Sequence, residues 1–184
     1  LTTTPQSENN ARWIEDGKRI AFLRGGQMWV MNSDGTGEKQ VSDIPDGMME
    51  FKLSPDGKRV LYSANFKVVK SPAEIHPNLP KSTARTIEGL MYRHWDHFVE
   101  TIPHTYLADF DGNTLGEWVD LLAGAPYELP AEPFGGIEQL DFSPEGDRIV
   151  YSCRKKTGRD YAFSTNSDIF LLNLPDNNCI NISE

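Results

Sequence analysis

Charged and aromatic side chains gather in residues 88–98, which read EGLMYRHWDHF. The carboxylates of Glu88 and Asp96 can hold a cation through charge-assisted hydrogen bonds, and Arg93 can orient such a carboxylate. The simpler alternative is an exposed pair between Arg93 and Asp96 at i, i+3, which contributes roughly a few tenths of a kcal/mol. We take Glu88, Tyr92, Arg93, Trp95 and Asp96 as the candidate binding residues of the chain.

Three of the four histidines lie in the same part of the chain. His94 and His97 stand at i, i+3 and can share a metal ion if Asp96 or His104 supplies a third ligand. The alternative is a set of polar side chains that hydrogen-bond to the neighbouring structure. We favour this second interpretation and expect no metal and no cofactor.

The elements that position these residues follow from a repeated phrase. LSPDGKRVLY at 53–62 returns as FSPEGDRIVY at 142–151 and, with changes, as WIEDGKRIAF at 13–22. Proline fixes φ at the first corner of a turn, an acidic residue suits the next position, and glycine supplies a positive φ. Each phrase therefore predicts a β-hairpin.

The spacing of the phrases indicates the fold class. Asp16 and Asp56 are 40 residues apart, and Asp56 and Glu145 are 89 apart. A period of about 40–45 residues with four strands is typical of a β-propeller blade. We predict an all-β chain, a partial β-propeller of about three four-stranded antiparallel blades at roughly 9–43, 48–124 and 136–184, filling residues 1–184.

The second and third units are longer than the first, and the extra residues fall between their second and third strands. Both insertions should therefore lie on one rim, which often marks the binding face of a repeat protein. The longer insertion covers about 65–103. Within it Leu90, Met91, His94, Trp95 and Phe98 share a helical face. This spacing predicts an amphipathic helix or helical turn, capped by Ser82 or Thr83 and ended by Pro103.

Composition excludes several classes of protein. The net charge of −9 argues against nucleic-acid binding, which needs a basic surface. No apolar run approaches the length of a membrane span. Cys153 and Cys179 fall at opposite ends of non-adjacent predicted strands, so we expect two small buried side chains rather than a disulfide.

Three blades cannot close a ring, because propellers have about four to eight. The chain also begins at Leu1 rather than Met. We expect the N-terminal piece of a longer propeller, whose open sheet edges could pair with a second copy.

The segment IEGLMYRHWDHF, followed by HTYLADFDG, resembles the propeller domain of the prolyl oligopeptidase family of serine peptidases, in its dipeptidyl-peptidase-five and acylaminoacyl-peptidase branches. The resemblance covers nearly the whole chain, and YRHWD is more specific than the Ser-Pro-Asp-Gly turns. It implies a propeller that filters substrates for an α/β-hydrolase domain with a Ser-Asp-His triad. The 184 residues contain no G-x-S-x-G nucleophile motif, so we expect no catalytic residue and no activity in this chain.

The resemblance also implies partners and site roles. The partners would be short peptides with a free or acylated N-terminus and the absent hydrolase domain. Glu88 or Asp96 would hold the peptide amine, Arg93 would orient a carboxylate or a substrate carbonyl, and Trp95 would pack or stack beside them. We expect a periplasmic or secreted protein, with a cytoplasmic one as the alternative.

Two rival functions need no peptidase. One is a periplasmic propeller that binds a protein partner, like that of the Tol system, and the other is a polysaccharide or surface-assembly protein. A plain scaffold has no need of the long insertion, so this feature favours the peptidase interpretation.

Overall fold

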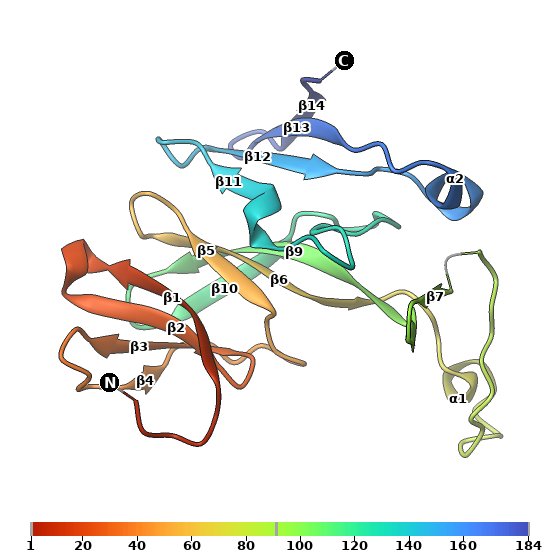
Figure 1. Ribbon diagram of the computed structural model, residues 1–184, viewed down its shortest axis with the longest axis horizontal. Helices are drawn as coiled ribbons and strands as arrows, with labels where there is room; N and C mark the ends of the chain where they lie inside the picture. The colour runs from red at the N-terminus through yellow and green to blue at the C-terminus, as the bar shows by residue number, and fades with distance from the viewer. Residues whose placement is uncertain (1, 91, 184) are drawn as a thin grey trace.

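Three four-stranded antiparallel sheets follow one another along the chain in the computed structural model, which describes residues 2–90 and 92–183 (Figure 1). The prediction of an all-β chain built from such sheets is confirmed. The first sheet is β1 (Glu8–Ile14), β2 (Arg19–Arg24), β3 (Gln27–Asn32) and β4 (Lys39–Gln40); the second, in spatial order, is β10 (Leu115–Asp120), β9 (Thr101–Phe110), β6 (Arg59–Lys67) and β5 (Glu50–Leu53); the third is β11 (Leu140–Phe142), β12 (Arg148–Cys153), β13 (Asp168–Asn173) and β14 (Asn178–Asn181).

The repeated phrase closes hairpins through a network of short-range hydrogen bonds. In the turn between β5 and β6, Ser54 Oγ accepts the Arg59 N–H at 2.9 Å and donates to Asp56 Oδ1 at 2.7 Å. Gly57 has φ +68°, a left-handed conformation that glycine adopts without a steric penalty. Ser143 Oγ accepts the equivalent N–H between β11 and β12 at 3.1 Å.

The arginines of the first two phrases also connect neighbouring sheets, whereas Arg148 of the third interacts with Glu145 and Asp147 of its own turn. Arg19 of the first sheet donates to the Gly112 carbonyl of the second sheet at 2.7 Å. Arg59 of the second sheet donates to the Gly146 carbonyl in a turn of the third. Each copy of the phrase therefore closes a hairpin, and the first two copies also link one sheet to the next.

The central strands of the second sheet, β6 and β9, are buried on both faces. Val60 and Tyr62 of β6 belong to one apolar cluster with Met28 of the first sheet. Leu61, between them, belongs to another cluster with Ile149 of the third sheet. Because side chains alternate along a strand, a strand covered on both faces needs an uninterrupted apolar run, which Val60, Leu61 and Tyr62 supply.

The long insertion is shorter than expected. β6 and β9 continue pairing as far as Asn65–Pro103 and Lys67–Thr101, so the chain leaves the sheet only after Lys67 and returns at Thr101. The range of about 65–103 is therefore too wide. Pro103 lies inside β9 and ends no helix, which corrects the predicted boundary.

The helix or helical turn predicted between Ser82 or Thr83 and Pro103 is wrong for the described residues of that segment. Arg93–His94 (β7) and His97–Phe98 (β8) form a two-stranded ribbon. Trp95 at its tip has φ +42°, and the Arg93 guanidinium donates to the Trp95 and Asp96 carbonyls at 3.0 and 3.3 Å. These contacts fix a tight turn that is incompatible with a helix.

One short helix does occur in the described part of the insertion. It is α1 (Pro72–Ile75), which begins at Ser71 rather than at Ser82 or Thr83. Ser71 and Glu74 form a reciprocal capping box, which satisfies N–H groups of the first turn. Met91, placed on the face of the predicted helix, lies outside the described residues.

Both insertions lie at the same end of the molecule. The third sheet carries α2 (Gly158–Phe163) between β12 and β13, and Figure 1 shows it on the same side as α1 and β7. Two 3-10 turns complete the elements, Glu15–Gly17 between β1 and β2 and Ile137–Gln139 before β11. The hairpin turns of the repeated phrase lie at the opposite end, so the sheets separate the two sets of loops.

The cysteines are free thiols in different environments. Cys153 is buried and Cys179 is exposed. The expectation of two buried side chains is wrong for Cys179, since β14 is the outer strand of the third sheet.

Replacing a side chain between the sheets should destabilise the chain strongly. Leu61 is fully buried, so Leu61→Ala should lower the free energy of unfolding by about 2–5 kcal/mol. Urea unfolding followed by tryptophan fluorescence measures this. Val119 is 63% exposed on β10, and Val119→Ala should cost less than about 0.5 kcal/mol. Equal losses in the two variants would contradict the packing described above.

Candidate functional site

The two insertions and the loop after β10 surround two cavities at one end of the molecule. One cavity, of about 400 Å³, is lined by residues of both insertions, including His94 and Tyr161, and by Glu128 of the loop. The other, of about 680 Å³, lies between α1 and residues 84–90. Gly158 of α2 lines both. This end therefore has the concave surface that a small ligand or short peptide requires.

The predicted binding residues fall into two groups. Glu88 and Tyr92 line the 680 Å³ cavity, together with Phe98, whose ring stacks on Tyr92 at 6.5 Å between centroids. The larger part of the predicted set, Arg93, Trp95 and Asp96, forms the turn of the ribbon instead. None of these three lines either cavity in the part of the chain that is described.

The turn residues have structural partners of their own. The Trp95 ring is 73% exposed and meets Phe134 edge-on at 5.2 Å between centroids. Asp96 has a side chain that is 95% exposed, and its carboxylate lies 3.2 Å from His97 Nδ1. The hydrogen bond with His97 holds the pKa of Asp96 below its ordinary value. The predicted surface pair between Arg93 and Asp96 is replaced by hydrogen bonds from Arg93 to carbonyl groups.

The smaller cavity contains a buried carboxylate that sequence reasoning missed. Glu128 is only 4% exposed. Its Oε1 accepts the Tyr161 hydroxyl and, at 3.2 Å, the Glu132 N–H, and it lies 4.0 Å from Arg154. Burial raises the pKa of Glu128, and the Tyr161 hydrogen bond opposes that effect. The signal for this site in the sequence is weak, because it consists of two acidic residues, Glu128 and Glu132, in a proline-containing loop.

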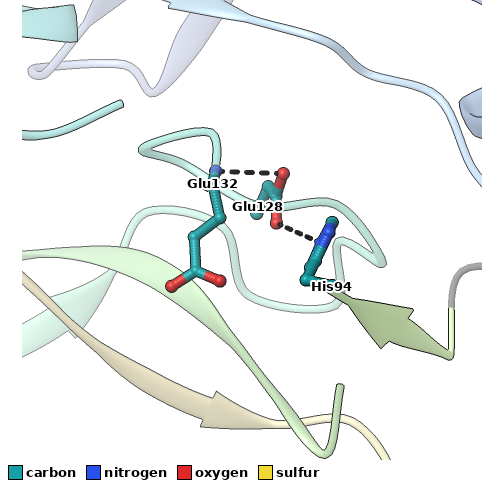
Figure 2. A group of neighbouring side chains, drawn as sticks. All are labelled: His94, Glu128 and Glu132. Carbon is teal, nitrogen blue, oxygen red and sulfur yellow. Dashed lines mark hydrogen bonds and ion pairs between the residues drawn. The ribbon is translucent and has the colours of Figure 1, made fainter. Parts of the chain in front are cut away.

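Glu128 faces His94, and Glu132 lies beside them (Figure 2). His94 Nε2 lies 4.0 Å from Glu128 Oε2, and His97 Nε2 lies 3.9 Å from Glu132 Oε2. The histidine group expected from sequence is divided, because His104 is fully buried elsewhere, with Nδ1 2.9 Å from Asp120. The structure thus combines His94 with two carboxylates from a distant loop.

A third cavity, of about 1140 Å³, lies at the opposite end, among the hairpin turns of the first two sheets. Three of its carboxylates, Glu15, Asp56 and Asp111, already accept hydrogen bonds from neighbouring residues of their own turns. Asp56 accepts the Lys58 N–H at 3.1 Å, and Asp111 accepts the Asn113 N–H at 2.8 Å. These groups serve the turns, so the insertion end is the stronger candidate for a functional site.

No helix among the described residues is long and apolar enough to cross a membrane.

Comparison with known proteins identifies relatives of this chain. No family model matches the chain. The whole chain is 46% identical over 188 residues to dipeptidyl-peptidase 5 of Porphyromonas gingivalis and 39% identical to dipeptidyl-peptidase 5 of Porphyromonas endodontalis. It spans 28% and 27% of the lengths of these relatives.

Among solved structures, an acylaminoacyl peptidase of Pyrococcus horikoshii aligns with 96% of this chain at a TM-score of 0.58 and 18% identity, with 25% of its own chain covered. That likeness concerns the fold alone. The alignment with dipeptidyl-peptidase 5, which covers the whole chain at 46% identity, is the stronger finding. The chain therefore belongs to the prolyl oligopeptidase family, in the branch that contains dipeptidyl-peptidase 5.

Proposed function

We propose that the chain is part of the substrate-gating β-propeller of an exopeptidase-type serine peptidase. The match to dipeptidyl-peptidase 5 over the full length of the chain carries this proposal. The three sheets are then blades, at about 9–43, 48–124 and 136–184, and a hydrolase domain outside these 184 residues performs the chemistry. The face-to-face packing of the sheets supports this arrangement.

The insertion end is the surface that would meet the substrate. Short peptides with a free or acylated N-terminus would enter between the two insertions, where the 400 and 680 Å³ cavities lie. Because both insertions contribute to the walls, their shape would exclude folded proteins and admit extended peptides. This is the gating role.

Glu88 is the better of the two predicted amine anchors. It lines the 680 Å³ cavity beside Tyr92, and no ion pair engages it among the described residues. Asp96 is solvated and already interacts with His97. A carboxylate free of competing partners can form charge-assisted hydrogen bonds with an ammonium group, which supports Glu88 as the anchor.

Neutralising Glu88 should therefore weaken the binding of peptides with a free amine. In a longer protein that combines this chain with its hydrolase domain, Glu88→Gln should raise KM for free-amine dipeptidyl substrates about tenfold or more, because a hydrogen bond to a charged group is lost. Substrates with a blocked N-terminus should be unaffected. Asp96→Asn should act in the same direction but more weakly.

The matched control is Glu117→Gln, an exposed carboxylate on β10. This variant should leave KM unchanged for both classes of substrate. Equal effects of Glu88→Gln on free and blocked substrates would remove the amine-anchor role while leaving the gating role untouched.

The chain by itself should hydrolyse no dipeptidyl or aminoacyl chromogenic substrate, because its sequence holds no nucleophile motif. The measurement is release of the chromophore by highly purified chain, with a sample inactivated by a serine-directed inhibitor as the reference. Turnover that persists through purification and is absent from the inhibited sample would contradict the proposal.

The rival function, a Tol-like propeller that binds a protein partner, has less support, because the relatives that align with the whole of this chain are named as peptidases.

Two further parts of the proposal concern the whole protein. We propose a periplasmic or secreted location, which cell fractionation tests. Pairing of open sheet edges between two copies is tested by the mass of the particle in solution.

A further inference from the structure

Three potential metal ligands converge at the wall of the 400 Å³ cavity (Figure 2). His94 comes from β7 in the long insertion, while Glu128 and Glu132 come from the loop after β10. One ligand atom from each residue lies within 4.8 Å of the other two. Side chains so far apart in sequence meet here because the insertion and the loop are both attached to the second sheet.

The two oxygens of Glu128 have different surroundings. Oε1 accepts the Tyr161 hydroxyl and the Glu132 N–H, and it is the oxygen nearest Arg154. Oε2 faces His94 Nε2 at 4.0 Å and accepts no hydrogen bond from the described residues. A carboxylate that is 96% buried thus has one oxygen held by donors and the other directed, without a donor, at an imidazole nitrogen.

We propose that His94 Nε2, Glu128 Oε2 and a carboxylate oxygen of Glu132 bind one divalent transition-metal ion, of which zinc fits best. Imidazole and carboxylate together are a donor set that zinc uses in proteins. Zinc binds such atoms at about 2.0–2.2 Å, so the three ligand atoms must approach to about 3.3–3.5 Å from one another. Binding therefore shortens the 4.0 Å between His94 Nε2 and Glu128 Oε2 by about 0.5–0.7 Å, and the other separations, which are within 4.8 Å, by at most about 1.5 Å.

The surroundings of the cluster allow this movement. The Glu132 side chain is 26% exposed and His94 lies on a two-residue strand at the surface, so both can move without disturbing the packed core. Glu128 stays in place because its Oε1 is held. The Tyr161 hydroxyl and the Glu132 N–H then act as the outer hydrogen bonds that orient a metal ligand.

The charges and the open side of the site also suit a cation. Two carboxylates carry two negative charges and Arg154 offsets one of them, so the cluster favours the addition of positive charge. The ionisable groups in contact with the two carboxylates are His97, 3.9 Å from Glu132, Arg154, 4.0 Å from Glu128, and the Tyr161 hydroxyl, while Lys67 and Lys156 line the same cavity. Three protein ligands leave a fourth position for water or a substrate carbonyl. Because His94 and Glu128 line the cavity, that position would open into it.

The test uses this chain alone and so does not depend on peptidase activity. Metal-free chain is titrated with Zn²⁺ by isothermal calorimetry, and with Co²⁺ by visible absorption, which reports a low-symmetry nitrogen and oxygen site. We expect one ion per chain with a Kd on the order of micromolar or tighter. His94→Ala and Glu132→Gln should each weaken binding at least tenfold and remove the Co²⁺ band.

His76→Ala is the matched histidine control, because His76 is exposed and follows α1 outside the cluster. It should bind as the original chain does. Because Glu128 is buried and a change there disturbs the packing around it, Tyr161→Phe tests the same carboxylate through its outer hydrogen bond and should weaken binding about tenfold. Circular dichroism checks that each variant is folded. Absence of a stoichiometric ion, or equal affinity in the His94 and His76 variants, would overturn the proposal.

Discussion

The burial of the central strands of the second sheet on both faces is the constraint from which the rest of the arrangement follows. Val60 and Tyr62 pack toward the first sheet and Leu61 toward the third, so neither neighbour can be removed without exposing apolar surface. The same strand, β6, continues past this core, still paired with β9 as far as Lys67 and Thr101. Both ends of the long insertion are therefore attached to paired strands rather than to a flexible loop.

The packing between the second and third sheets also holds the loop that carries Glu128 and Glu132. The Leu129 N–H donates to the Pro103 carbonyl at 3.0 Å, and the Thr105 hydroxyl donates to the Leu129 carbonyl at 2.9 Å. The Leu129 side chain is buried in the cluster between the second and third sheets. Glu128 precedes this anchor, so the position of its carboxylate is set by the packing of the sheets. Buried backbone groups that find partners in this way make a loop part of the rigid structure.

Prediction from sequence succeeded where local chemistry decides the structure. The turn around Ser54 and Gly57 is closed by residues within the phrase itself, so the phrase was enough to place the hairpin. It failed in the insertion, where the helical spacing of Leu90, His94 and Phe98 competed with a turn held by Arg93. Prediction also missed Glu128. Its partner Tyr161 comes from the insertion of the third sheet and its partner His94 from the insertion of the second, and no spacing in the sequence reveals that these residues meet.

The partners of Glu128 show that the two insertions act as one unit. Burying a carboxylate is costly unless donors and positive charge compensate it. Here α2 of the third sheet supplies the Tyr161 hydroxyl, and Arg154, just before α2, stacks on that ring at 3.6 Å. The insertion of the second sheet supplies His94 on the opposite side. Neither insertion alone surrounds Glu128, so both insertions are needed to complete the surroundings of this carboxylate.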